Sequence, residues 1–192
     1  MADMFPAILS LCDYTGIWSQ PYVDAGYHVI RVDLQDGVDM RLMRPPAMEL
    51  RGIIAQPPCT DFAGSGARWW ESKGEQALLD AIALVDCCCR FVAFKRPVWW
   101  VMENPIGRLS RFIGEPQFTF DPHEYAGWLD DPAPEAYTKR TCLWGNFTPP
   151  IKNSVEPVLG SKMHLVPPGP ERQNIRSATP QGFARAFFES NP

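Results

Sequence analysis

Residues 52–61 read GIIAQPPCTD, and the architecture of the chain is easiest to infer by starting from these ten residues. Their apolar run predicts a buried strand, which two prolines end because proline has no backbone donor and a fixed φ. Cys59 therefore stands directly at a strand exit. An apolar run followed by polar groups occurs twice more, in residues 7–16 (AILSLCDYTG) and residues 98–105 (VWWVMENP).

Helical patterns alternate with these strands. Strands that alternate with helices predict an α/β fold with a mostly parallel sheet. In such a sheet ligands bind outside the carboxyl ends of the strands, so the polar groups that follow the three apolar runs are expected at one edge. The other regular segments are Trp18–Ala25 and Glu71–Phe94 (helices), Tyr27–Leu34 (a strand), and Thr138–Leu143 and Pro180–Phe188.

Length and composition favour a single domain over residues 1–192, with an irregular and basic part over residues 136–192. Hydrophobic residues make up 45% of the chain, but no apolar run approaches the roughly 20 residues of a membrane span, so no membrane partner is expected. The first residues lack the basic lead-in of a signal peptide. Residues 87–89 are consecutive cysteines and no C-x-x-C pair is present, which predicts no metal site and a reducing, cytoplasmic location.

Charge is distributed unevenly along the chain. The net charge is −4, which by itself argues against a polyanionic partner. From residue 137 onward, however, the chain has seven Lys or Arg residues and three acidic residues, which gives a net charge of +4. The preceding 136 residues carry a net charge of −8. This asymmetry is compatible with nucleic-acid binding by the C-terminal part, and an uninformative surface composition is the alternative.

Cys59 and Glu103 are the residues best suited to covalent chemistry. A lone cysteine is more often a small core residue than a nucleophile, but the two prolines before Cys59 project it from the sheet edge. Glu103 follows a fully apolar run, so it is either a surface residue or a half-buried carboxyl group whose pKa is raised. The sequence AGSGARWW at residues 63–70 predicts a mobile loop able to close over a substrate.

Five motifs carry a resemblance to a known family. PPC (residues 57–59) and ENP (residues 103–105) resemble the two core motifs of the DNA cytosine-5 methyltransferases. The chain most resembles small phage and prophage members that lack a full target-recognition domain, which implies a minimal Rossmann-like S-adenosylmethionine-dependent methyltransferase fold. The stretches that resemble the family's cofactor turn, basic strand and late motif are LSLCDYTGIWSQPYVDAGYHVIRVDL (9–34), YTKRTCLWGNF (137–147) and RSATPQGFARAFF (176–188).

The resemblance implies transfer of a methyl group from S-adenosylmethionine to carbon 5 of cytosine in DNA. In this family a cysteine thiolate adds to carbon 6 and a glutamate protonates or hydrogen-bonds ring nitrogen 3, which makes carbon 5 nucleophilic. Cys59 would be the nucleophile, activated as a partial thiolate near cationic groups, Glu103 the acid and Arg140 the basic catalytic residue. The implied substrate-contacting positions are Pro58, Ser65, Arg68, Asn104, Pro105 and Lys139.

Cofactor contacts are implied around the first two strands and beside the cysteine. Asp33 suits the ribose hydroxyls and Asp39 the adenine amino group, with a solvated strand end as the alternative for each acid. The family's glycine-rich turn is replaced by CDYTGIW, which has one glycine, so a modified form of S-adenosylmethionine is an open alternative. The implied positions are Asp13, Tyr14, Thr15, Gly16, Trp18, Asp33, Leu34, Asp39 and Pro57.

The substrate and partners are defined less sharply by these motifs. Residues 143–173 are too few for a full target-recognition domain, so the expected DNA substrate is a single-stranded or flipped-out cytosine, with a partner protein or a second copy completing the clamp. Arg68, Trp69 and Trp70 either stack on bases or pack on their own helix. An RNA or nucleotide substrate and a catalytically silent relative that binds DNA or protein are the alternatives.

Overall fold

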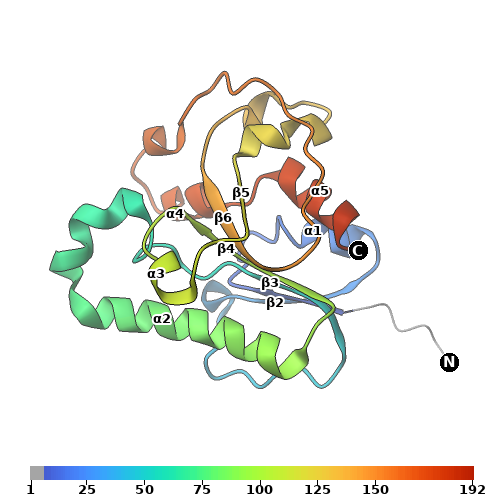
Figure 1. Cartoon of the computed structure of the whole chain (residues 1–192), viewed down its shortest axis with the longest axis vertical. Helices are drawn as coiled ribbons and strands as arrows, with labels where there is room; N and C mark the ends of the chain where they lie inside the picture. The colour runs from blue at the N-terminus through green and yellow to red at the C-terminus, as the bar shows by residue number, and fades with distance from the viewer. Residues whose placement is uncertain (1–6) are drawn as a thin grey trace.

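The computed structural model describes residues 7–192 and is built on a six-stranded sheet (Figure 1). The expected domain also includes residues 1–6, which lie outside the described residues. The order across the sheet is β2-β1-β3-β4-β6-β5. The strands are β1 (Ala7–Leu11), β2 (His28–Val32), β3 (Leu50–Ala55), β4 (Trp99–Pro105), β5 (Phe118–Phe120) and β6 (Thr141–Asn146).

Five of the six strands run in the same direction. β1 pairs in parallel with β2 and β3, and β3 pairs in parallel with β4. β6 alone is reversed, since it is antiparallel to both β4 and β5. The expectation of an α/β, Rossmann-like fold with a mostly parallel sheet is confirmed.

The strand order has a switch point between β1 and β3. β1 connects to β2 on one side, and the neighbouring β3 connects to β4 on the other. In open α/β sheets ligands bind beyond the carboxyl ends of the strands at such a switch point. The turn after β1 and the Pro-Pro-Cys segment after β3 both lie at this edge.

Side chains of the strands alternate between two cores, one on each face of the sheet. In β1, Leu9 packs into the core covered by α2 (Trp70–Lys95), whereas Ile8 packs into the core covered by α1 (Gln20–Asp24) and α5 (Gln181–Ser190). Figure 1 shows α2 along one side of the strands and α1 with α5 along the other. Helices on both faces explain why the inner strands are apolar on both sides.

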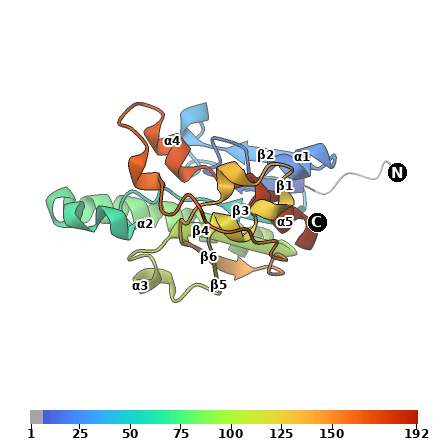
Figure 2. The ribbon, with the colours of Figure 1, turned by 90° about the horizontal axis from the view of Figure 1, so that it is seen from above.

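The remaining helical elements are short and belong mainly to the connections. Figure 2 shows α4 and the first part of α2 on the side away from the start of β1, which is the carboxyl edge of the parallel strands. These elements are α3 (Ser110–Ile113), α4 (Arg172–Ser177) and 3-10 helices at residues 34–36, 64–69, 122–124, 126–128, 133–135 and 163–165.

β4 is longer than the sequence predicts. The apolar run suggested that the strand stops before Glu103, but β4 continues to Pro105. Its last three residues pair with Leu143, Cys142 and Thr141 of β6. The expectation that Glu103 lies beyond the strand is therefore wrong, because an antiparallel neighbour extends the pairing on one side.

Candidate active site

The carboxyl ends of β3 and β4 bring Cys59 and Glu103 together. The two strands pair in parallel near these ends. The buried Asn104 side chain donates a hydrogen bond of 2.9 Å from Nδ2 to the carbonyl oxygen of Pro57. This bond joins the strand that carries Glu103 to the segment that carries Cys59, so the two groups are held by one rigid element.

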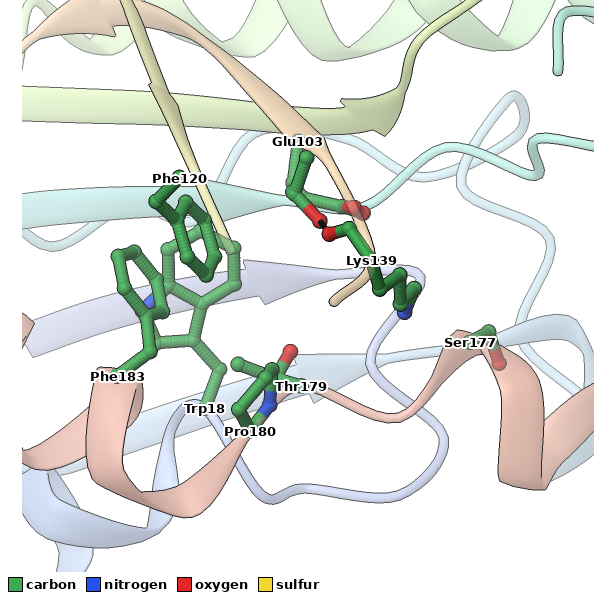
Figure 3. A pocket seen from close by; sticks show the side chains of 9 residues that line it. Trp18, Glu103, Phe120, Lys139, Ser177, Thr179, Pro180 and Phe183 are labelled. Atoms are coloured by element: carbon green, nitrogen blue, oxygen red, sulfur yellow. Dashed lines mark hydrogen bonds between the residues drawn. The ribbon is translucent and has the colours of Figure 1, made fainter. Parts of the chain in front are cut away.

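A small cavity lies over Glu103 at this edge. Its volume is about 10 Å³, on the order of one water molecule. Figure 3 shows Glu103 and Lys139 next to each other, with the rings of Trp18, Phe120 and Phe183 gathered to one side. The other lining residues are Thr141, Ser177, Thr179 and Pro180.

Burial and neighbouring charges set the protonation of both reactive groups. Burial raises the pKa of the Glu103 carboxyl group, and the ammonium group of Lys139 partly opposes that rise. Burial also raises the pKa of the Cys59 thiol, and the negative charge of Glu103 raises it further. Lys139 and Arg176 act in the opposite direction on Cys59 but do not outweigh burial. Burial and Glu103 thus oppose the ionisation of Cys59 that the sequence leads us to expect, and the two cations favour it.

Lys139 and Arg140 occupy different environments although they are adjacent. The Arg140 guanidinium forms an ion pair of 2.8 Å with Asp121, and its side chain is half exposed. Lys139 donates its backbone N–H to the same carboxylate at 2.8 Å, while its side chain lines the cavity with Glu103. The sequence favoured Arg140 as the basic group, whereas the geometry brings Lys139 to the cavity, because Asp121 holds Arg140 elsewhere.

Arg176 and Gln56 are neighbours of the site that the sequence did not single out. Arg176 is in α4, one residue before the cavity-lining Ser177, and its charge lowers the pKa of Cys59. The Gln56 side chain accepts a hydrogen bond of 2.8 Å from the Thr179 hydroxyl. Both belong to motifs that the sequence marked, the Gln-Pro-Pro-Cys exit and the Arg-Ser-Ala-Thr segment, but neither residue type stood out there.

The loop after Cys59 is tied to the segment that follows β4. Gly64 donates its N–H to the Ile106 carbonyl oxygen, and Arg108 donates its N–H to the Phe62 carbonyl oxygen, each at 2.8 Å. The Arg108 Nε also donates to the carbonyl oxygen of Asp61 at 2.7 Å. These three hydrogen bonds fix Asp61, Phe62 and Gly64, at the start of the expected mobile loop, to the segment after β4.

Beyond these anchors, the expected substrate-contacting residues of the loop point outward. Ser65 and Arg68 are exposed, and the Arg68 guanidinium lies 5.0 Å from the ring of Trp69. Trp69 is 53% exposed. Trp70 instead packs under the Arg108 guanidinium at 4.3 Å. The exposed ring of Trp69 is therefore compatible with stacking on a base, whereas Trp70 packs within the protein.

Asp13 organises the turn after β1. Its carboxylate accepts hydrogen bonds from the hydroxyl groups of Ser10 at 2.8 Å and Ser19 at 2.7 Å, and from the Gly16 N–H at 3.0 Å. All three bonds are buried and internal to the turn. The structure therefore places Asp13 as a support of the turn, with exposed Tyr14 and Thr15 at its tip.

The other expected cofactor positions, and the expected substrate contacts Pro58 and Pro105, differ in their exposure to solvent. Asp33 accepts a hydrogen bond from the Gln35 N–H at 2.8 Å and remains partly exposed. Asp39 forms a forked ion pair with Arg41, which lowers the pKa of the Asp39 carboxyl group. Trp18 and Pro57 are buried, whereas Leu34 and Pro58 are exposed and Pro105 is partly buried.

Buried polar atoms without hydrogen-bond partners are concentrated at this edge. Buried polar groups are normally paired, so a cluster of unpaired ones marks a place where a polar ligand fits. Three of the four at this edge are donors, which suits a ligand that offers oxygen or nitrogen acceptors. Within residues 7–192, the four unpaired atoms at this edge are Trp18 Nε1, Gln56 Nε2, Arg176 Nε and the acceptor Asn104 Oδ1. The unpaired atoms elsewhere are Trp70 Nε1, Arg90 Nε and Trp99 Nε1.

Comparison with known proteins finds similarity at the level of structure. No family model matches the chain, and no curated protein matches it. A candidate DNA modification methyltransferase encoded within an E. coli prophage is similar in structure, with a TM-score of 0.45 and 14% sequence identity. The match covers 73% of this chain and 46% of that one, so the chain spans less than half the length of its neighbour. No helix in residues 7–192 is long and apolar enough to cross a membrane.

Proposed function

We propose that this protein is a methyltransferase that modifies carbon 5 of cytosine in DNA through a covalent adduct with Cys59. The observation that supports it best is the meeting of Cys59 and Glu103 at adjacent strand ends, where the charge of Glu103 acts on the Cys59 thiol and the charge of Lys139 acts on both groups. A thiol next to a carboxyl group whose pKa is raised is the pair that addition to a cytosine ring needs.

Cys59, Glu103 and Lys139 would each have a distinct role in this reaction. The Cys59 thiol first loses its proton to water. The thiolate sulfur then forms a bond to carbon 6 while Glu103 gives its proton to ring nitrogen 3, and the carbon 5–carbon 6 electron pair becomes available at carbon 5. After carbon 5 has been substituted, it loses its proton to water, the carbon 6–sulfur bond breaks, and nitrogen 3 returns its proton to Glu103. Lys139, the cation at the cavity, would hold the carbonyl oxygen of the base.

The electrostatics of the site favour one pair of protonation states for this reaction. The Glu103 carboxylate opposes ionisation of Cys59, and Lys139 and Arg176 favour it. When Glu103 carries a proton, the opposing charge is absent and the two cations remain. A protonated Glu103 with an ionised Cys59 is therefore the combination in which the thiol becomes nucleophilic without a second negative charge.

The crevice between β1 and β3 would hold the cofactor. Bound S-adenosylmethionine supplies the electrophilic methyl group. Asp33 would accept hydrogen bonds from the ribose hydroxyls, and the unpaired Trp18 Nε1 and Gln56 Nε2 donors fit its polar atoms. Asp39 is available to an adenine amino group only if it shares its carboxylate with Arg41.

DNA with an unpaired cytosine would be the substrate. A cytosine must leave the base stack to reach Cys59, at a cost of a few kcal/mol that single strands avoid. The exposed ring of Trp69 and the neighbouring Arg68 guanidinium offer a stacking surface for a base beside the target. A partner protein or a second copy would supply further DNA contacts.

The raised pKa of Cys59 favours one second candidate, a relative that binds DNA without modifying it. A buried neutral thiol is a poor nucleophile, and a protein that only binds would need neither its ionisation nor a methyl donor. The two candidates differ in whether a covalent bond to the base is ever formed.

Trapping on DNA that contains 5-fluorocytosine tests the proposal, because fluorine at carbon 5 cannot leave as a proton does. Single-stranded and duplex oligonucleotides are incubated with the protein and S-adenosylmethionine, then resolved on a denaturing gel and by mass spectrometry. We expect a cofactor-dependent adduct that is absent in Cys59→Ala and retained in Cys89→Ala, which removes an exposed cysteine. DNA binding without an adduct would favour the second candidate and overturn the first.

A further inference from the structure

The cavity over Glu103 is too small for the base that the proposed reaction needs. Its volume of about 10 Å³ is that of one water molecule, and a pyrimidine ring is several times larger. One wall of the cavity is formed by Ser177, Thr179 and Pro180, which Figure 3 shows on one ribbon across from Glu103. The opposite side belongs to β4 and β6, which lie within the sheet. The wall at Ser177 is therefore the one whose movement would make room for a base.

Residues 163–178, here called the strap, lead into this wall and are held weakly along their length. None of them is buried. Among the hydrogen bonds found within residues 7–192, those of the strap stay within residues 162–178, except one of 3.3 Å from Gln35 Nε2 to Asn174 Oδ1. Segments with so few buried contacts open locally at a low free energy, without unfolding of the whole domain.

Both ends of the strap are fastened to the same part of the protein. Before it, Lys162 donates from Nζ to the Pro134 carbonyl oxygen at 2.6 Å, and its ammonium group lies 4.4 Å from the ring of Tyr137. After it, Gly182 in the first turn of α5 donates its N–H to the Glu135 carboxylate at 3.0 Å. The strap can therefore swing between two fixed ends while α5 stays in the core.

The strap also approaches the reactive strand ends. Directly after it, the Thr179 hydroxyl donates to Gln56 Oε1 at 2.8 Å, and Gln56 lies three residues before Cys59 in the chain. The charge of Arg176, within the strap, lowers the pKa of Cys59, and the buried Arg176 Nε has no hydrogen-bond partner within residues 7–192. In this closed position the strap covers the approach to Glu103 and brings a cation near Cys59.

We propose that the strap is a lid over the active site, which is closed in the free protein and swings outward when a nucleotide base enters. The identity of the base rests on the proposed function, but the opening itself needs neither DNA nor cofactor. Opening would enlarge the cavity on its Ser177 side and withdraw Arg176 from Cys59. Closing over a bound base would return Arg176, whose unpaired Nε–H is then available to an acceptor on the substrate.

Hydrogen exchange on the free protein tests whether the strap opens by itself. The Ile175 and Ala178 amides are bonded within the strap, and the Ala184 amide is bonded within α5. In urea below the unfolding transition, Ile175 and Ala178 should exchange at rates that urea does not change, whereas Ala184 should follow global unfolding. Exchange of all three amides only through global unfolding would overturn the proposal.

Thiol labelling tests whether this opening controls access to the site. Thr179→Val removes the hydroxyl that bonds Gln56. It should raise both strap exchange and iodoacetamide labelling of Cys59 by the same factor, about two- to tenfold, the value of one hydrogen bond. Ser177→Ala is the matched control and should change neither rate, because the Ser177 hydroxyl donates within the strap, to the Asn174 carbonyl oxygen.

The remaining outcomes separate the lid from the proposed function. Faster strap exchange without faster Cys59 labelling, or the reverse, would overturn the lid. If Thr179→Val also speeds exchange in α5, Gln35→Ala takes its place, since it removes the Asn174 bond from outside the strap and should give the same paired rise. A paired rise with no 5-fluorocytosine adduct in the wild type or any variant would support the lid and overturn the proposed function.

Discussion

Gly107 is the position where a single methyl group should disturb the site most. It lies two residues beyond β4 and packs against the loop that follows Cys59. A Cβ at this position would lie 1.8 Å from the carbonyl oxygen of Phe62 and 2.9 Å from the Cα of Ala63. Since both neighbours are backbone atoms, no side-chain rotation relieves the overlap, and the loop must move away from β4.

The cost of Gly107→Ala follows from what that movement breaks. The Gly64–Ile106 and Arg108–Phe62 backbone hydrogen bonds span the contact, and each contributes about 0.5–1.5 kcal/mol. Strain from forcing extra volume into a packed site adds about 1–3 kcal/mol. We therefore expect the free energy of unfolding to fall by about 2–6 kcal/mol, and Cys59 to become more accessible as its loop retreats.

Urea unfolding and thiol labelling measure the two effects. Gly66→Ala is the matched control, because Gly66 lies in the same loop and its Cβ would meet only the Thr60 carbonyl oxygen at 3.5 Å, an ordinary contact. Iodoacetamide labelling of the Cys59 peptide, followed by mass spectrometry, should be faster in Gly107→Ala than in Gly66→Ala. Equal stabilities and equal labelling rates for the two variants would show that the loop is not held against β4 as described.

Two further substitutions test the electrostatics and the strand-end link. Glu103→Gln removes the negative charge that raises the pKa of Cys59, so the labelling rate of Cys59 should rise at lower pH than in the wild type. Cys89 in the same sample is an internal control. A pH profile of Cys59 labelling that does not shift would disprove the coupling between Glu103 and Cys59. Asn104→Ala leaves the buried Pro57 carbonyl oxygen without its donor and should lower the free energy of unfolding by about 1–3 kcal/mol, and a wild-type urea midpoint would contradict it.

The inner part of the fold could be predicted because each strand leaves a strong local signal. β1, β2, β3, β4 and α2 coincide closely with apolar or periodic runs that two-sided burial requires. β5 has three residues and α4 has six, too short for either pattern to be distinguished from a connection. The direction of β6 depends on which neighbour it pairs with, and hydrophobic alternation is the same for both directions.

Part of the candidate site could likewise be predicted from the sequence, and part could not. Cys59 and Glu103 could be placed at one edge because parallel strands end together. The sequence favoured Arg140 over Lys139 as the basic residue, because it does not reveal that Asp121 pairs with Arg140 in the fold. The sequence pointed to cations near Cys59, but it could not show that burial raises the pKa of the thiol.

Gly74 separates the start of α2 from the rest of that helix. Its φ of 77° and ψ of 178° are not helical, so residues 70–73 do not continue the hydrogen-bonded rod that packs under the sheet. The segment from Cys59 to Lys73 is instead fastened to the end of β4 through Arg108 and to itself through the Lys73–Asp61 ion pair of 2.7 Å. A displacement of this segment would be transmitted to the strand that bears Glu103 and not along the long helix. Cys59 and Glu103 would then move together, with the distance between them preserved.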